Sequence, residues 1–333
     1  MTKKTLVTGA DGFIGSHVVQ SLVSSGHDVR ALVHYNSRGS IGWLSDLPKN
    51  ILSQVDVFPG DIRDYDRCAE AVKGCKNILH LAALIGIPYS YHTPHSYIET
   101  NVKGTLNLLQ SAKTEHIECF IHTSTSEVYG TAQTVPISES HPLVGQSPYS
   151  ASKIAADHLA FSFFSSFDLP VVIIRPFNTY GPRQSNRAVI PAIISQILAG
   201  REKISLGATS PTRDFSYIDD TVEGLISPIG IKQAIGKTIN LGAGFEISIH
   251  DTAILLAKIM GKPITIVGDE KRERPIKSEV NRLFSDNRLA NKVLNWTPKF
   301  AGIEGFEHGL SKTTQWFLVN KDNEKYKDDS YAI

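Results

Sequence analysis

The sequence lacks most of the features that would tie a chain to a membrane, to nucleic acid or to a disulfide framework. It has three cysteines in 333 residues and no CxxC spacing, which favours a reduced cytosolic protein. No apolar run approaches the roughly 18 residues of a membrane span, and the first one is too short for a secretory signal. The formal net charge is only +1, so no nucleic-acid or membrane partner is expected. The twelve histidines are scattered without metal-ligand spacing, so we predict no metal and expect a soluble, cytoplasmic protein.

The sequence does have an alternation of short apolar runs and helical patterns. Strands are predicted at 5–8, 28–34, 77–82, 119–123, 170–175 and 238–241, and helices at 13–24, 105–112, 151–164 and 189–198. Such alternation predicts parallel βαβ units, and therefore an α/β fold with a doubly wound parallel sheet. Prolines interrupt the pattern beyond residue 175, which indicates a smaller mixed α/β region. We predict a dinucleotide-binding domain at 1–175 plus about 213–250, a substrate domain at about 176–212 and 251–317, and a loose tail at 318–333.

A glycine-rich segment links the first predicted strand to the first predicted helix. Gly9 permits a tight turn, Gly12 lets a pyrophosphate approach the backbone, and Gly15 lets helix and strand pack closely. We assign Phe13 and Ile14, between these glycines, to the same site. An ordinary strand-to-helix turn is the alternative, but the position at the head of a βαβ unit favours dinucleotide binding.

The choice of dinucleotide depends on the end of the second predicted strand, where an acidic residue normally holds the ribose hydroxyls of NAD. This chain has no acid there. Asn36, Ser37 and Arg38 could instead receive a 2′-phosphate, which favours NADP over NAD, although they could equally form a solvated loop. Asp61 and Ile62 follow a third apolar stretch and are placed to touch the adenine, with a plain surface aspartate as the alternative.

Tyr149 and Lys153 form a Tyr-x-x-x-Lys pair on one predicted helix face. A tyrosine is a poor base at neutral pH unless a cation lowers its pKa, and Lys153 lies one helical turn away. Beside a nicotinamide, such a tyrosine can take the proton of an alcohol that loses hydride. A nearby carboxylate, Glu127, could then take the proton that the new ketone acidifies, so the pattern indicates a reaction in which the hydride is returned. A chance Tyr/Lys pair and a solvated Glu127 are the alternatives.

From 4 to about 317 the chain resembles the extended short-chain dehydrogenase/reductase family, through the Gly-x-x-Gly-x-x-Gly loop and the Tyr-x-x-x-Lys pair. This resemblance implies that Leu81, Ala82 and Ala83 contact the cofactor, although core packing would explain the alanines equally well. It gives Asn101 a structural or proton-relay role. It also implies a homodimer formed through the helices at 105–112 and 151–164, whose apolar faces could otherwise be buried within one subunit.

The segment Thr125-Ser126-Glu127 resembles the Thr-Ser-Glu of the GDP-mannose branch of sugar-nucleotide 4,6-dehydratases. By that resemblance Thr125 hydrogen-bonds the sugar 4-hydroxyl and Glu127 removes the C5 proton. Ser126 stands where many relatives have an aspartic acid that protonates the leaving C6 hydroxyl. Either Ser126 relays a proton through water, or Glu127 serves both roles. UDP-glucuronate decarboxylases share Thr-Ser-Glu, but the residues that follow Tyr149 are those of dehydratases.

The second half of the chain resembles the family's substrate-binding region. The segment containing Asn178 is similar to the one that brings substrate and nicotinamide together. The resemblance places Arg187, Arg213 and Arg274 around a nucleotide diphosphate, whose oxygens suit guanidinium groups. Each of these arginines could alternatively be a solvated surface charge.

The residues at 35–37 and 42–44 resemble a branch of 4,6-dehydratases from bacterial legionaminic acid synthesis, which act on nucleotide-linked N-acetylglucosamine. We therefore predict an NAD(P)-dependent 4,6-dehydratase that recycles its cofactor and makes a 4-keto-6-deoxy sugar from GDP- or UDP-N-acetylglucosamine. A 4-epimerase, a UDP-glucuronate decarboxylase and a non-enzymatic dinucleotide-binding regulatory protein are the alternatives.

Overall fold

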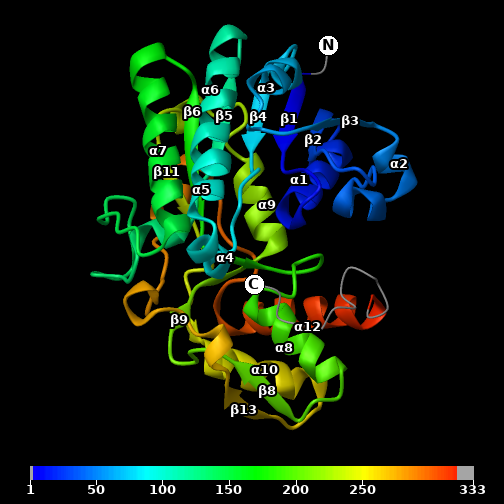
Figure 1. Cartoon of the computed structure of the whole chain (residues 1–333), viewed down its shortest axis with the longest axis vertical. Coiled ribbons are helices and arrows are strands. Elements are labelled where there is room, and N and C mark those ends of the chain that lie inside the picture. The colour runs from blue at the N-terminus through cyan, green and yellow to red at the C-terminus, as the bar shows by residue number, and fades with distance from the viewer. Residues whose placement is uncertain (1–2, 321–333) are drawn as a thin grey trace.

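A seven-stranded parallel sheet lies at the centre of the computed structural model, which describes residues 3–320 (Figure 1). The strand order is β11-β6-β5-β4-β1-β2-β3, and it reverses at β1, as in a doubly wound sheet. The predicted fold class is confirmed. The strands are β1 (Lys4–Thr8), β2 (Asp28–His34), β3 (Val55–Gly60), β4 (Asn77–His80), β5 (Cys119–Thr123), β6 (Val171–Pro176) and β11 (Thr238–Leu241).

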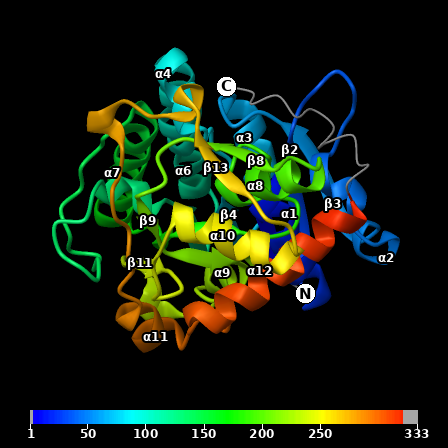
Figure 2. The same ribbon diagram turned by 90° about the horizontal axis from the view of Figure 1, so that it is seen from below.

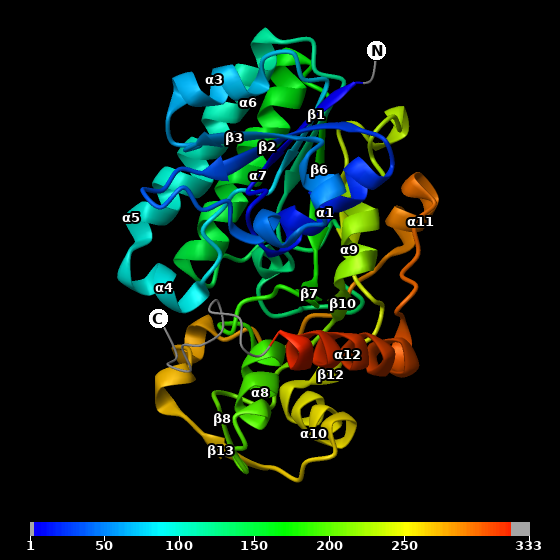
Figure 3. The same cartoon turned by 90° about the vertical axis from the view of Figure 1, so that its right-hand side faces the viewer.

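Helices cover both faces of this sheet (Figure 3). Side chains alternate along each strand, so neighbours enter opposite layers. Leu6 and Phe120 join the cluster beneath one set of helices, whereas Val7 and Ile121 join the cluster beneath the other. The first set is α3 (Tyr65–Val72), α6 (Gly104–Thr114) and α7 (Pro148–Phe167), and the second is α1 (Phe13–Ser24), α9 (Ile218–Ile226) and α11 (Arg288–Leu294).

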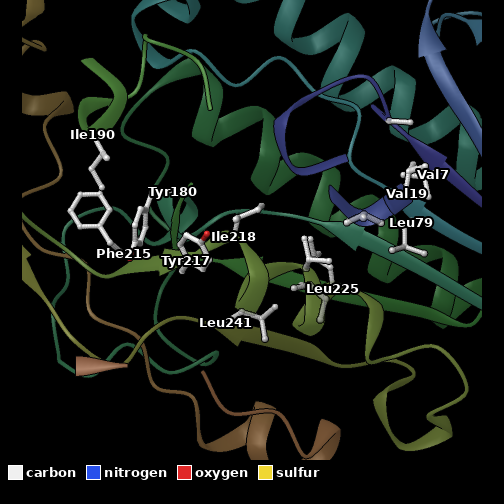
Figure 4. Close-up of a cluster of buried hydrophobic side chains, with 14 of the residues drawn as sticks. Val7, Val19, Leu79, Tyr180, Ile190, Phe215, Tyr217, Ile218, Leu225 and Leu241 are labelled. Carbon is white, nitrogen blue, oxygen red and sulfur yellow. The ribbon is translucent and has the colours of Figure 1, made fainter. Parts of the chain in front are cut away.

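A smaller mixed region lies beyond the carboxyl ends of the strands (Figures 1 and 2). Figure 4 shows one cluster of buried side chains that runs from Val7 and Leu79, on strands of the sheet, to Phe215 and Ile190 in this region. The two halves therefore share a core, and the predicted domain division remains a prediction. The region contains α8 (Val189–Leu198), α10 (Ile249–Met260), α12 (Gly302–Val319), and the paired strands β8 (Lys203–Leu206) with β13 (Thr265–Gly268), β7 (Asn178–Tyr180) with β10 (Phe215–Tyr217), and β9 (Thr212–Arg213) with β12 (Ile247–Ser248).

Helix α7 shows why boundaries differ from the sequence pattern. It begins three residues before the predicted start, because Ser147 Oγ accepts a hydrogen bond from Ser150 N and Pro148 occupies the first turn. It ends where Asp168 takes a left-handed conformation. The short helices α2 (Lys49–Leu52), α4 (Ile87–His92) and α5 (Pro94–Tyr97) were not predicted, since segments of one or two turns carry little periodicity.

The predicted tail at 318–333 begins inside α12, which continues to Val319, and residues 321–333 lie outside the described residues. Helix α11 packs against β11, although the predicted division assigns it to the substrate region. Between residues 3 and 320, no helix combines the length and apolar character needed to cross a membrane.

Candidate active site

The glycine turn between β1 and α1 is pressed against the end of β4. Gly9 has a φ of 64°, and a Cβ there would lie 2.9 Å from the backbone of Ala82. A Cβ at Gly15 would come within 2.0 Å of the Gly9 carbonyl oxygen. Thr8 Oγ1 also accepts from the backbone N–H groups of Leu81 and Ala82, at 3.2 and 3.1 Å. The structure thus brings the predicted cofactor segments at 9–15 and 81–83 together.

A buried histidine, His80, holds this junction. Its Nε2 lies 2.9 Å from Thr105 Oγ1, and Thr105 donates its own hydrogen to the carbonyl of Asn101. His80 Nε2 is therefore the donor of that pair, and Nδ1 accepts from Thr8 Oγ1 at 2.9 Å. Burial holds the pKa of His80 well below its ordinary value, which keeps the ring neutral and this single tautomer in place.

Asn101 lies on a π-helical turn, η2 (Ile98–Lys103), of a kind that often occurs at functional sites. Its Oδ1 accepts from Leu84 N at 2.8 Å, while its two amide hydrogens go to Leu84 O and Ser152 Oγ, both at 2.9 Å. Ser152 donates in turn to the carbonyl of Tyr149. These contacts support the structural role of the two that the resemblance implied.

The predicted catalytic residues meet at the carboxyl end of β5. Thr125 caps the turn η3 (Ser126–Tyr129) by accepting from Glu127 N at 3.2 Å, and Ser126 and Glu127 are both buried on that turn. Tyr149, near the start of α7, is also buried, and Thr125 is one of its polar neighbours. Burial raises the pKa of Tyr149 far above its ordinary value, and the Thr125 contact opposes that effect.

Lys153 is placed differently from the expectation that it lowers the pKa of Tyr149. Its Nζ donates to the carbonyl oxygen of Thr123 at 2.7 Å, because the end of β5 lies within reach of the buried side chain. Burial lowers the pKa of Lys153 itself to about 8, against the opposing influence of Asp157. In this arrangement burial keeps the pKa of Tyr149 raised, and the neighbour that opposes the rise is Thr125 and not Lys153.

A buried ionic network lies beneath these residues, centred on Asp157. Arg175 donates to Asp157 Oδ2 from Nε and Nη2, at 3.1 and 2.9 Å, and Ser124 donates to it at 2.9 Å. His122 Nε2 approaches Asp157 Oδ1 at 3.2 Å but is poorly aligned for a hydrogen bond. Burial alone would raise the pKa of Asp157, yet these neighbours lower it to about 2, so the carboxylate stays ionised.

A cavity of about 250 Å³ is lined by Arg274, whose Nη1 lies 3.9 Å from Glu127 Oε2 on the turn η3. Four of the five predicted substrate residues line the cavity, although Arg187 is largely exposed, whereas the fifth, Thr125, is not part of the lining. Within residues 3–320, Asn178 Oδ1 and Arg274 Nη1 are buried without a hydrogen-bond partner, so the cavity wall has unused polar atoms. The lining includes Asn178, Gln184, Arg187, Arg213, Arg274 and Glu279.

Glu279, which the sequence analysis missed, joins the substrate arginines to the catalytic turn. Its Oε1 lies 3.1 Å from Arg213 Nη2 and 3.6 Å from Arg274 Nη1. Arg274 Nη1 is also 3.9 Å from Glu127 Oε2. Two guanidinium groups therefore share two carboxylates at the catalytic end of the cavity. The sequence signal that could have identified Glu279 is its position five residues after Arg274, which was predicted to bind substrate.

A second group of missed residues covers the site. Tyr91 on α4 lies with its hydroxyl 2.6 Å from Ser278 Oγ, and Ser278 donates to the carbonyl of Gln146 at 2.6 Å. Tyr91 therefore donates to Ser278. Tyr91 also packs against the buried cluster that contains Tyr149. Residues 87–92 and 276–278 thus meet over the segment that leads into α7.

The loop predicted to hold the ribose of the cofactor, which we call the ribose loop (residues 36–38), lies outside this group of buried residues. The Asn36 side chain is used within its own loop, accepting from Arg38 N and Ser40 N and donating to His34 O and Ser40 O. Ser37 and Arg38 are exposed. A carboxylate does approach the end of β2, because Asp11 Oδ2 accepts from His34 N at 3.3 Å. The sequence search missed Asp11 because it belongs to the glycine turn and not to the strand.

Of the two residues predicted to touch the adenine, Asp61 forms a salt bridge with Arg63. Ile62 is buried, and its carbonyl accepts from Asn107 Nδ2 at 2.9 Å. A Cβ at Gly104 would lie 2.5 Å from Ile62 Cδ1, so Ile62 is tightly packed on α6. The two side chains therefore already have partners within the protein, and their contact with adenine remains a prediction.

Comparison with known proteins places this arrangement among enzymes of nucleotide sugars. The model of a family described as GDP-mannose 4,6 dehydratase matches residues 6–311. A UDP-glucose 4-epimerase of Mycolicibacterium smegmatis is 33% identical over 320 residues, which cover 94% of this chain and 98% of the relative. A dTDP-glucose 4,6-dehydratase of Actinoplanes sp. is 30% identical over 327 residues, covering 96% and 98%. The structure of DesIV, a dTDP-glucose 4,6-dehydratase of Streptomyces venezuelae with NAD and TYD bound, superposes with a TM-score of 0.83 at 29% identity, covering 96% of this chain and 98% of the other.

Proposed function

Since the chain belongs to the GDP-mannose 4,6-dehydratase family, we propose that it is a nucleotide-sugar 4,6-dehydratase that makes a 4-keto-6-deoxy sugar. The observation that carries this proposal is the buried carboxylate of Glu127, which lies on the same turn as Thr125, a polar neighbour of the buried Tyr149. A carboxylate in that place can serve a proton transfer at the carbon next to the one that Tyr149 activates.

A nicotinamide dinucleotide fits the glycine turn, because Gly9 and Gly15 let the turn pack closely against Ala82 and against itself, which places the N-terminus of α1 at the end of β1. Gly12 precedes α1 without a side-chain cap, so the first N–H groups of the helix can receive a phosphate. Besides Gly9, Gly12 and Gly15, the predicted contacts at 81–83 would hold it. When bound, the nicotinamide would accept hydride from the sugar C4 and later supply it to C6.

The chain's own residues would then move the protons. Tyr149 takes the proton of the 4-hydroxyl while Thr125 holds that hydroxyl. Glu127 takes the C5 proton, which the 4-ketone has made acidic, and water leaves from C6. The proton for the leaving hydroxyl comes from Glu127 itself or through Ser126 and a water molecule. Arg274 Nη1 lies 3.9 Å from Glu127 Oε2, so a guanidinium group faces the carboxylate that takes the C5 proton.

A 4-epimerase is the second candidate, because the most identical of the relatives named above carries that activity in its name. Epimerisation at C4 has no need of a base at C5, so the buried Glu127 favours dehydration. A UDP-glucuronate decarboxylase shares the Thr-Ser-Glu segment. A regulatory protein without activity would have no reason to keep Tyr149, Lys153 and Glu127 together.

We further propose that the sugar is N-acetylglucosamine linked to GDP or UDP, from the resemblance of the residues at 35–37 and 42–44 to the legionaminic acid branch. The protein would act as a homodimer through α6 and α7. Phe161 and Phe167 on α7 are each 48% exposed, which supports an apolar contact with a second copy. Localisation in the cytoplasm remains a prediction.

The test is incubation of the purified protein with UDP-, GDP- and dTDP-linked glucose and N-acetylglucosamine, followed by mass spectrometry. Dehydration gives a loss of water, epimerisation gives no change in mass, and decarboxylation gives a loss of carbon dioxide. In D₂O the dehydrated product should carry deuterium at C5. With Glu127→Gln, hydride transfer should persist as absorbance of bound reduced cofactor, whereas dehydrated product should fall by about 10²–10⁴-fold. Full dehydration and normal C5 exchange in that variant would show that Glu127 is not the base.

A further inference from the structure

Arg183 has a backbone conformation that is rare for a residue other than glycine. Its φ is 69°, in the left-handed region that side chains other than glycine rarely adopt. Among residues 3–320, the other such residues besides glycine are Asp168 and Asn295, which directly follow α7 and α11 and end those helices. Arg183 ends no helix. A conformation of this kind persists only where the surrounding contacts impose it, and it often marks a functional site.

The contacts that impose it come from α1, the helix that follows the glycine turn. Arg183 Nη2 donates to Gln20 Oε1 at 2.8 Å, and Nη1 donates to Ser16 Oγ at 3.3 Å. On the same helix, His17 Nε2 lies 3.0 Å from the carbonyl oxygen of Pro182, which can only accept, so His17 is the donor. Burial and the nearby Arg183 lower the pKa of His17 to about 4, so the ring is neutral near pH 7 and this contact does not change there.

The loop is seated against a second helix as well. A Cβ at Gly181 would lie 2.5 Å from Ile218 Cγ2, which places the start of the loop directly on α9. Helices α1 and α9 pack on each other under the sheet. The loop from 181 to 184 is therefore docked on two helices of the sheet half at once.

The same loop then forms one wall of the substrate cavity. Gln184 and Arg187 both line the cavity, and so does Val189, the first residue of α8. The Gln184 side chain also donates to the carbonyl of Thr179 at 2.8 Å, which holds it against β7. Three residues thus separate the docking point at Arg183 from the exposed Arg187.

We propose that Arg183 is a positioning residue, which fixes the wall of the nucleotide-sugar cavity at Gln184 and Arg187 to the helix of the glycine turn. Arg183 does not line the cavity itself, so it acts through these neighbours. The inference rests on the proposed function only in that the cavity binds a nucleoside diphosphate. It holds equally for a dehydratase or an epimerase.

The experiment measures the dissociation constants of UDP, GDP and dTDP by calorimetry on the cofactor-loaded protein, with thermal unfolding in parallel. Arg183→Gly tolerates the left-handed backbone but removes both contacts to α1. We expect it to weaken the best-bound nucleotide by about tenfold, the scale of one lost charged hydrogen bond. Gln20→Ala, on α1 and outside the cavity lining, should weaken it in the same direction. The double variant should bind the nucleotide no more weakly than Arg183→Gly alone, because Gln20→Ala removes a contact that Arg183→Gly has already lost.

Asp168→Gly is the matched control, since it makes the same backbone substitution at an exposed left-handed residue that ends α7. It should leave nucleotide binding unchanged. Unchanged binding in both Arg183→Gly and Gln20→Ala would overturn the inference, even if their unfolding temperatures fell. A contact with only a structural role changes the unfolding temperature and leaves the dissociation constant as it is. Failure of the wild-type protein to bind any of the three nucleotides would instead overturn the proposed function, and this inference with it.

Discussion

The catalytic turn and the ribose loop differ in how much of their geometry the surrounding protein determines. Around Glu127 and Tyr149 the side chains are buried, and the buried Asp157–Arg175 pair lies beneath them. The ribose loop after β2 is mostly exposed, and the Asn36 side chain bonds only within its own loop. Packing therefore fixes the catalytic turn before any ligand arrives, whereas the ribose loop has only local contacts to hold it.

This difference determines which property of the protein a substitution in each region changes. A buried polar group must be satisfied, so a change at the catalytic turn costs stability as well as chemistry. An exposed loop loses little when a side chain changes, so its effect is confined to the ligand. Substitutions at the catalytic turn should accordingly have large effects on turnover and on stability, whereas substitutions in the ribose loop should have small effects on cofactor affinity.

The largest effect is expected at Tyr149. Tyr149→Phe removes the hydroxyl that takes the alcohol proton while keeping the ring that packs against Tyr97. We expect turnover to fall by about 10³–10⁴-fold, the upper range for loss of a positioned base, with no reduced cofactor formed. Stopped-flow absorbance of the bound cofactor measures this. Appearance of reduced cofactor at the wild-type rate would contradict the role given to Tyr149.

The next effect tests the network beneath the site. Asp157→Asn leaves the buried Arg175 without its counter-charge and should lower the free energy of unfolding by on the order of 3 kcal/mol. The folded pKa of Asp157 lies below its ordinary value, so its stabilising effect is present above about pH 4 and is lost as the pH falls toward 2. The difference between wild type and variant, measured by urea unfolding, should therefore shrink over that range.

A control for that loss is Asp157→Asn combined with Arg175→Met, which removes both charges. The double variant should be more stable than the single one, because no unpaired cation remains buried. Equal stability of the two variants would mean that the pair contributes through packing and not through charge.

The sequence was a good guide where packing imposes a pattern and a poor one where contacts are made between distant segments. The strands at 28–34, 119–123 and 238–241 were predicted with the bounds observed, because buried parallel strands carry continuous apolar runs. The five residues proposed as catalytic were predicted from their motifs and from the family resemblance, and their roles stay a prediction. Asp11, His80 and Glu279 were missed, since their roles depend on partners 23 or more residues away or on a loop that folds back over the site.

Lys153 should give the reaction an alkaline limit. Its pKa of about 8 means that the cation is present at pH 7 and is lost as the pH rises further. We expect kcat/KM to fall by roughly tenfold per pH unit above that value, because the site then loses the cation one helical turn from Tyr149. Stability should move in the opposite direction, because a lysine with a lowered folded pKa costs stability while it is charged. A flat pH profile up to 10, with normal activity in Lys153→Met, would contradict this assignment.

The smallest effect is expected in the ribose loop, where we predict that the choice between NAD and NADP is made. Arg38 would attract a 2′-phosphate, whereas the Asp11 carboxylate at the end of β2 would repel it. Because Arg38 is exposed and screened, Arg38→Ala should weaken NADP by only about 1 kcal/mol, roughly fivefold, and leave NAD unchanged. Asp11→Asn should shift the preference the other way, weakening NAD and strengthening NADP by a similar factor. Fluorescence titration of both cofactors against both variants separates these outcomes. Equal losses for NAD and NADP in Arg38→Ala would remove Arg38 from cofactor choice, and a wild-type preference for NAD that Asp11→Asn abolishes would assign that choice to the glycine turn.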